Sequence, residues 1–317
     1  MPDGDDLPSL LGFFEGRQPP APAWFTAALA DAPARATFDA DGAAIELLTW
    51  GERGRPGLLF LHGNAAHADW WSFIAPFFAA THRCAAISWS GMGGSAWRQS
   101  YSVAQFAAEL LGATDAGDLA AAGPPIVVAH SFGGIPLIYT AAHHPERLGG
   151  GIMVDSFVPP PARKRPSWLV TGRAPGRYPT LAAALARYRF APPQTSEHLY
   201  AVDHLARGSL HQVAADANGP AGWTWRFDPN LWATLDRTAA DALVPQARVP
   251  IGLLHGAESA LVGEDHVAHL SAQLPDCRFV AAVPGARHHI MVDQPLALVA
   301  ALRVGISALS APGRNMA

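Results

Sequence analysis

The chain has 317 residues, half of them hydrophobic, a length that allows one large α/β domain or two smaller ones. Its formal net charge of −4 lacks the basic excess that binding to a phosphate backbone requires, so we expect a small, mostly neutral molecule rather than nucleic acid as its partner. No apolar run reaches the roughly 18 residues of a membrane span, and the acidic start differs from a signal peptide, so we expect a cytoplasmic protein without a membrane partner. The sequence leaves open whether the protein forms a homodimer.

Residues 1–36 are expected to form an N-terminal arm, which is loose before Pro22. Residues 37–50 then contain two extended runs on either side of Asp41-Gly42, a dipeptide typical of tight hairpin turns. This pattern predicts a β-hairpin that completes one edge of a sheet.

From residue 58 onward, short apolar runs that end in small residues alternate with longer alanine-rich helical stretches. Strands that are covered by helices on both faces have this continuous apolar pattern, which predicts an α/β fold with a mostly parallel, doubly wound sheet. The runs are residues 58–63, 84–91, 125–131, 150–156, 251–256 and 277–285. The only cysteines, Cys84 and Cys277, begin two of these runs and lie outside any CxxC or Cys/His cluster, so neither a disulfide nor a metal site is expected.

The alternation stops between residues 159 and 249, where proline, arginine and tryptophan are frequent. About 90 residues are too many for a structureless loop between two strands. We therefore expect residues 159–249 to form a helical cap over the carboxyl ends of the strands, and residues 37–158 and 250–317 to form the core.

The segment AHSFGG, residues 129–134, follows an apolar strand and precedes a helical stretch. A sharp turn between strand and helix lifts a serine hydroxyl clear of the sheet, provided that the neighbouring residues are small, as Ala129 and Gly133 are. The segment resembles the GxSxG elbow of the α/β-hydrolase family, with alanine in place of the first glycine. The resemblance implies an α/β-hydrolase fold and Ser131 as the nucleophile.

His62-Gly63-Asn64, after the first central strand, is similar to the HG loop of the same family. The resemblance implies that the Asn64 backbone amide binds the developing oxyanion. Phe132 would supply the second amide, because it directly follows the nucleophile at the start of a helix, where N–H groups lack partners and the helix dipole favours negative charge.

The segment PGARHH, residues 284–289, resembles the PGxGH segment in which the family carries its catalytic histidine. His288 lies seven residues before Pro295, which matches the family spacing, and is expected to be the base. Its neighbour His289 is expected to point elsewhere.

The family most often carries its catalytic acid at the position of Ser259, but serine has no charge with which to stabilise an imidazolium. Two carboxylates could replace it: Asp155, at the end of the run 150–156, and Glu258 on the same loop as Ser259. We favour Asp155, because the surrounding GIMVDSFVPP resembles relatives of haloalkane dehalogenases and zearalenone lactonases, which carry the acid there.

Several tryptophans are candidates for the substrate pocket. Trp70 and Trp71 follow the oxyanion loop, and Trp223 and Trp225 lie in the cap together with Trp232. Packing inside the core or the cap is the competing interpretation for each of them. Residues 88–97 resemble the family's DxxGxGxS loop, in which Ser88 replaces the usual aspartate, and are expected to have a structural role.

The resemblance implies acyl transfer to water without a cofactor or a metal. We expect cleavage of a carboxylic ester or lactone of a small, hydrophobic substrate through an acyl-enzyme on Ser131. Two alternatives stay open. One is a serine-dependent hydrolase of carbon–carbon bonds in dienols, and the other is a ligand-binding relative with little turnover, which the uncharged Ser259 keeps in consideration.

Overall fold

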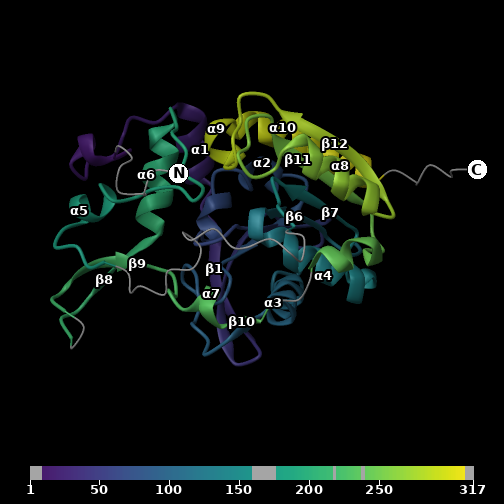
Figure 1. Ribbon diagram of the computed structural model, residues 1–317, viewed down its shortest axis with the longest axis horizontal. Coiled ribbons are helices and arrows are strands. Elements are labelled where there is room, and N and C mark those ends of the chain that lie inside the picture. Colours follow the sequence, from purple (N-terminus) through teal and green to yellow (C-terminus); the bar gives the residue numbers. More distant parts are fainter. Residues whose placement is uncertain (1–8, 159–175, 217–218, 237–239, 311–317) are drawn as a thin grey trace, which may run out of the picture.

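The computed structural model describes residues 9–158, 176–216, 219–236 and 240–310. The predicted α/β architecture is confirmed: a sheet of eight strands in the order β1-β2-β4-β3-β6-β7-β11-β12 runs through the molecule (Figure 1). The first two pairs in this order, β1–β2 and β2–β4, are antiparallel, and all the other pairs are parallel. The strands are β1 (Ala34–Ala40), β2 (Ala43–Trp50), β3 (Gly57–Leu61), β4 (Arg83–Ile87), β6 (Ile126–His130), β7 (Gly150–Val154), β11 (Ile251–Gly256) and β12 (Cys277–Val283).

The predicted hairpin is the β1–β2 edge of this sheet, and it begins at Ala34, three residues earlier than expected. Asp41 and Gly42 form its turn, with φ angles of 50° and 77°. Two consecutive positive φ values match the right-handed twist of the flanking strands, which explains the Asp-Gly pair at this point.

Helices cover both faces of the sheet, which is why its central strands are apolar along their whole length. In β3, Leu59 and Leu61 pack into one core cluster, while Leu58 and Phe60 pack into the other. The first cluster lies under α3 (Val103–Ala116), α4 (Gly134–His143) and α8 (Glu264–Gln273), and the second under α1 (Ala23–Ala30), α2 (Pro76–Ala79) and α10 (Pro295–Ser310) (Figure 1).

The residues between β7 and β11 form more than helices. After residue 175 they contain α5 (Leu181–Leu185) and α6 (Leu199–Gly208), followed by an antiparallel hairpin of β8 (Leu210–Val213) and β9 (Gly222–Trp225). Three short elements complete the segment: α7 (Leu231–Thr234), β10 (Leu235–Asp236), which pairs with β5 (Tyr101–Ser102), and the 3-10 helix η6 (Ala240–Gln246), which packs on α4. We call residues 176–249 the insertion; the first part of the predicted cap, residues 159–175, lies outside the described residues.

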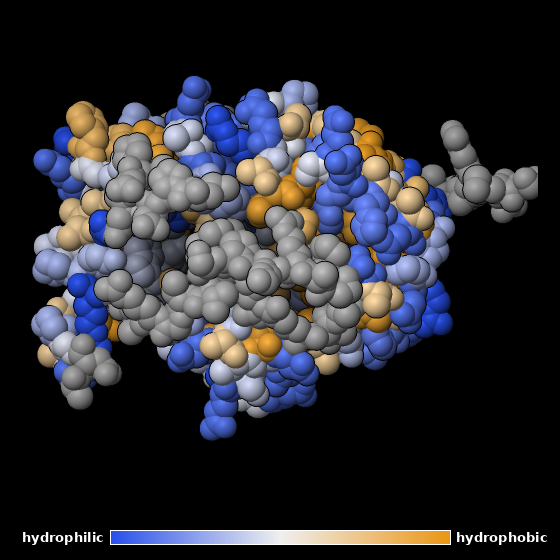
Figure 2. Space-filling model, in the orientation of Figure 1, coloured by the Kyte–Doolittle hydropathy of each residue, from blue (hydrophilic) through white to orange (hydrophobic). Residues whose placement is uncertain are grey.

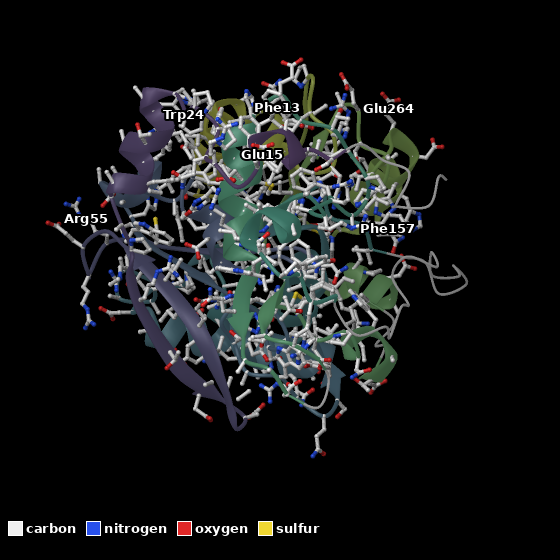
Figure 3. All side chains as sticks on the ribbon, turned by 90° about the vertical axis from the view of Figure 1, so that its left-hand side faces the viewer. Phe13, Glu15, Trp24, Arg55, Phe157 and Glu264 are labelled. Atoms are coloured by element: carbon white, nitrogen blue, oxygen red, sulfur yellow. The ribbon has the colours of Figure 1, made fainter. Side chains whose placement is uncertain are left out.

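The described part of the N-terminal arm packs against this insertion instead of being loose. Leu11, just before the short helix η1 (Gly12–Phe14), is only 2% exposed, and the Ser9 hydroxyl donates to the Ala186 carbonyl at 2.8 Å. In α1, the rings of Trp24, which is labelled in Figure 3, and of Phe25 contact Tyr200 of α6. Among the described residues, none of the helices has both the length and the apolar character needed to cross a bilayer. The division into arm, core and cap stays a prediction.

Candidate active site

Ser131 lies in a sharp turn between β6 and α4. It begins the single-turn 3-10 helix η3 (Ser131–Gly133), and its φ of 51° is a left-handed value that is rare for a residue with a side chain. The turn is tightly packed, because a Cβ added to Gly63 would lie 3.0 Å from the Ser131 Cβ, and one added to Gly133 would lie 3.1 Å from the His62 carbonyl. Strain of this kind persists only where the surroundings fix the backbone.

Asn64 and Phe132, the two predicted oxyanion residues, share one neighbour. The indole N–H of Trp232, in α7, donates to the Asn64 side-chain oxygen at 2.8 Å, and the same indole packs edge-on against the Phe132 ring at 5.5 Å between centroids. The Phe132 amide belongs to the first turn after β6, where N–H groups have no partner within the helix. One side chain of the insertion therefore touches both residues of the predicted oxyanion hole.

His62 holds the loop that leads to Asn64. Its Nε2 accepts from the Trp89 backbone N–H at 3.0 Å, so the ring proton is on Nδ1, which donates to the Gly63 carbonyl at 2.7 Å. Burial lowers the pKa of His62 to about 3, against which the Gly63 hydrogen bond acts weakly, and the ring is neutral near pH 7. The His62-Gly63 pair therefore has a structural role, because the histidine ring fixes the carbonyl of the glycine that follows it.

His288 is joined to Asp155. Its Nδ1 lies 2.6 Å from Oδ2 of Asp155, and both side chains are almost completely buried. The His288 ring also packs against His130, the residue before Ser131, at 4.8 Å between centroids, and the His288 carbonyl lies 3.0 Å from His130 Nε2. The loop after β12 thereby brings the predicted base next to the turn that holds the predicted nucleophile.

Asp155 follows β7 and accepts two further hydrogen bonds. The Gly256 amide donates to its Oδ1 at 2.8 Å, and the Ser259 hydroxyl donates to its Oδ2 at 2.6 Å. The Ser259 oxygen in turn accepts from the amides of Leu261 and Val262, which fixes its orientation. Ser259 therefore supports the carboxylate from the position where most of the family has the acid itself.

Glu258, the other candidate acid, points away from this cluster. Its side chain is 55% exposed, and its nearest cation is Arg287, at 3.9 Å. No hydrogen bond joins it to His288 in the part of the chain that the structure describes.

His289 reaches toward the insertion. Its backbone N–H donates to the side-chain oxygen of Gln194 at 3.1 Å, and its Nδ1 lies 2.7 Å from the same oxygen. The Gln194 amide donates to Asp293 at 3.2 Å, and that carboxylate accepts the Arg287 amide at 2.8 Å. Burial lowers the pKa of His289, and the nearby His288 lowers it further. Gln194, which binds the loop of the predicted base His288, was not anticipated, and no motif around it signals this contact.

The four predicted pocket tryptophans have different surroundings. Trp70 packs against His289 and stacks on His130, so it lies beside the histidine cluster. Trp71 is fully buried against Phe60, which places it in the core. In β9, Trp223 pairs through its backbone with Tyr178, whereas Trp225 lines a cavity of about 240 Å³ next to the oxyanion loop.

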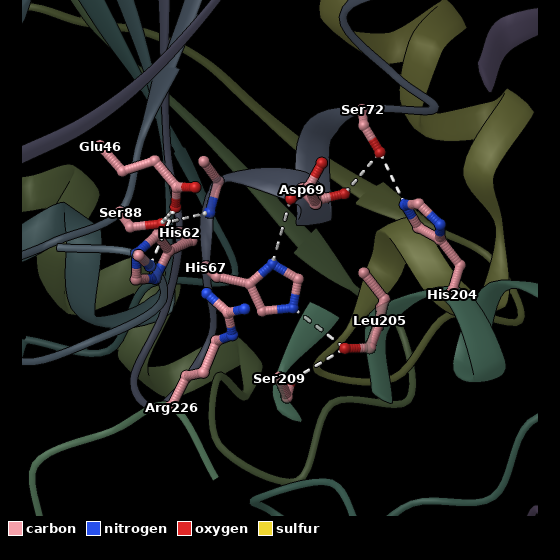
Figure 4. Close-up of polar contacts among 12 residues, drawn as sticks. Glu46, His62, His67, Asp69, Ser72, Ser88, His204, Leu205, Ser209 and Arg226 are labelled. Atoms are coloured by element: carbon pink, nitrogen blue, oxygen red, sulfur yellow. Dashed lines mark hydrogen bonds and ion pairs between the residues drawn. The ribbon is translucent and has the colours of Figure 1, made fainter. Parts of the chain in front are cut away.

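A network of polar side chains supports the oxyanion loop that contains Asn64 (Figure 4). The Ser88 hydroxyl donates to Glu46 at 2.6 Å and accepts from the Ala68 amide at 3.0 Å. His67 Nε2 lies 3.0 Å from the Leu205 carbonyl of α6, which fixes the loop to the insertion. Among the described residues, no group of three or more His, Cys, Asp and Glu side chains is arranged to hold a metal ion.

The sequence model of the alpha/beta hydrolase family matches residues 58–302. The chain belongs to this family. It is 29% identical over 278 residues to the esterase Rv0045c of Mycobacterium tuberculosis, a match that covers 82% of this chain and 85% of the relative. A solved structure of the same esterase superposes with a TM-score of 0.67 at 26% identity, covering 87% of this chain and 92% of the other. The thioesterase domain from the curacin biosynthetic pathway has a TM-score of 0.68 at 22% identity, over 86% and 99% of the two chains, which shows a shared fold. This hydrolase is thus esterase-like.

The two candidate acids can be separated by paired variants. Asp155→Asn should lower kcat for a p-nitrophenyl ester by about 10³- to 10⁴-fold, because an amide cannot stabilise the imidazolium and favours the wrong tautomer of His288. Glu258→Gln should stay within twofold of the wild type. Circular dichroism spectra check that both variants fold, and the reverse ranking of the two rates would transfer the role to Glu258.

Acid should destabilise this hydrolase below pH 6.5. Burial lowers the pKa of seven histidines: the deeply buried His62, His67, His130, His204 and His289, and the partly buried His82 and His211. An unfolded chain binds protons at these residues below a pKa of about 6.5 while the native state does not, so the free energy of unfolding falls as pH falls from 7 to 5 and is level above 7. The raised pKa values of Glu109 and Asp293 act in the opposite direction.

Thermal unfolding between pH 5 and pH 8 measures this dependence. His204→Gln should make the slope shallower, because the pKa of His204 is lowered to about 4 and glutamine can keep a hydrogen bond to the Ser72 hydroxyl. A melting temperature that does not change between pH 7 and pH 5 would contradict the neutral state of these rings.

Proposed function

We propose that this protein is a serine hydrolase that cleaves a small carboxylic ester or lactone through an acyl-enzyme on Ser131. The observation that carries the proposal is the 2.6 Å contact of His288 with Asp155, made by a ring that packs against the residue before Ser131. A base that is oriented by a carboxylate and delivered beside a strained serine turn is the arrangement that activates a weak alcohol nucleophile.

In the proposed reaction, the Ser131 hydroxyl attacks the substrate carbonyl while its proton passes to Nε2 of His288. The negative charge that develops on the carbonyl oxygen is bound by the amides of Asn64 and Phe132. Asp155 stabilises the imidazolium through Nδ1. The proton then moves to the leaving alcohol, and water, deprotonated by the same histidine, hydrolyses the acyl-enzyme.

The relatives support acyl transfer to water. The curated relative is called an esterase, and one solved structure with the same fold is called a thioesterase. Carbon–carbon bond cleavage would use the same serine, but no observation in this chain favours it. The uncharged Ser259, which suggested a binding protein with little turnover, has a different explanation here, because its hydroxyl supports Asp155.

Ser131→Ala should abolish turnover of p-nitrophenyl esters and labelling by a fluorophosphonate, because both need an activated serine. Activity should be measured on matched panels of short esters, lactones and dienol diketones, with the wild type and Ser131→Ala compared on each. Loss of labelling together with loss of ester or lactone cleavage supports the proposal. An unlabelled wild type, or equal rates for the two proteins, would refute it, and turnover of the dienol panel alone would identify the carbon–carbon hydrolase.

Trp232→Phe tests the link between the insertion and the oxyanion hole. Phenylalanine keeps a ring against Phe132 but lacks the N–H that holds the Asn64 side chain. Without this hydrogen bond the Asn64 loop, and with it the Asn64 backbone amide, should shift. We expect kcat to fall about 10-fold with little change in KM, because a displaced amide weakens binding of the transition state more than of the ground state. Trp223→Phe, on the same insertion, is the control. An unchanged kcat in the Trp232 variant would mean that the contact does not position the oxyanion hole.

A further inference from the structure

A cavity of about 240 Å³ begins at the oxyanion loop and extends into the insertion. Ala65 and Ala66, the two residues after Asn64, form part of its wall, and Trp225 of β9 forms another part. On the face shown in Figure 2, hydrophilic side chains predominate over β8 and β9, and the surface is hollowed beside them. The cavity is smaller than the roughly 300–1,000 Å³ of sites for drug-sized ligands, so it suits a small group.

Three arginines line this cavity: Arg187, Arg189 and Arg226. No aspartate or glutamate is among the described residues of its lining. Arg226 is half-buried, and its Nε donates to the Leu210 carbonyl at 3.0 Å, which holds the guanidinium without neutralising it. Within the described ranges, no carboxylate oxygen lies within 4 Å of the Arg226 nitrogens.

Two carboxylates of the polar network in Figure 4, Asp69 and Glu46, are engaged with other partners. Both oxygens of Asp69 accept from Arg35, at 2.5 and 3.2 Å, and Glu46 accepts from the Ser88 hydroxyl. His67, whose ring lies beside Arg226 in Figure 4, carries no positive charge near pH 7, because burial, together with a smaller contribution from Arg226, lowers its pKa. Neither of these two carboxylates therefore neutralises Arg226.

We propose that this cavity binds a carboxylate at the far end of the substrate's acyl chain, with Arg226 as the residue that determines this specificity. The inference rests on the proposed ester hydrolysis and names its substrate class: esters of short dicarboxylic acids. The wall of the cavity begins at Ala65, the residue directly after Asn64, whose amide would bind the carbonyl oxygen of the acyl group. A guanidinium matches a carboxylate in shape and can donate two parallel hydrogen bonds to it. The substrate thus carries one charge, in contrast to the hydrophobic molecule expected from the sequence.

Two p-nitrophenyl esters of equal chain length test the proposal: the neutral pentanoate and the mono-ester of glutarate, which ends in a carboxylate. The wild type should prefer the glutarate by at least 10-fold in kcat/KM, and this preference should shrink as salt screens the charge. Arg226→Gln should lower the preference by about 10- to 100-fold, mainly through KM, because a charge-assisted hydrogen bond is lost. Arg177→Gln, on the same insertion but paired with Asp216, should keep the wild-type preference.

A wild type that prefers the pentanoate, or an Arg226 variant that loses the same factor on both esters, overturns the proposal. A binding measurement separates this failure from failure of the proposed hydrolysis. Isothermal titration calorimetry of glutarate into Ser131→Ala should give a dissociation constant that Arg226→Gln weakens by at least 10-fold. If the wild type cleaves no ester, the hydrolase proposal fails while this titration still decides whether the cavity binds a carboxylate. Absence of glutarate binding together with ester cleavage would leave the hydrolase and refute the carboxylate site.

Discussion

A carboxylate that is removed from water must be compensated by donors, and in this hydrolase that requirement joins three separate segments of the chain. Asp155 is fully buried, and its oxygens accept from the Gly256 amide, the Ser259 hydroxyl and Nδ1 of His288. The donors come from the end of β11, from the loop behind it and from the loop after β12. One side chain therefore links the loops that follow these three neighbouring strands.

Much of the site could be predicted because its signals are local. The strand before Ser131, the small residues around it and the helix behind it are consecutive in the sequence, and so are the residues of the HG loop. The fold was predictable for the same reason, since strands covered on both faces are recognisable one at a time. The hairpin turn was equally clear, because two adjacent positive φ angles favour a pair such as Asp41-Gly42.

The acid could not be settled from the sequence, because the choice depends on which strands are neighbours. β7 lies between β6 and β11, which brings the end of Asp155's strand next to Gly256 across 101 residues of sequence. Glu258 and Ser259 are one residue apart, yet only the serine faces the carboxylate. Trp70 and Trp71 show the same limit: adjacent residues of one type have different surroundings, and side-chain type alone does not separate a core residue from a neighbour of the histidines.

Two hydrogen bonds, from Trp232 to Asn64 and between Gln194 and His289, attach the insertion to the two loops that carry the proposed chemistry. The insertion is therefore not an interchangeable module. Replacement by the corresponding segment of a relative, in evolution or by engineering, would have to preserve a hydrogen-bond donor to the Asn64 side chain and an acceptor for His289. Divergence of substrate preference in this lineage is consequently expected by substitutions within the insertion more readily than by its wholesale replacement.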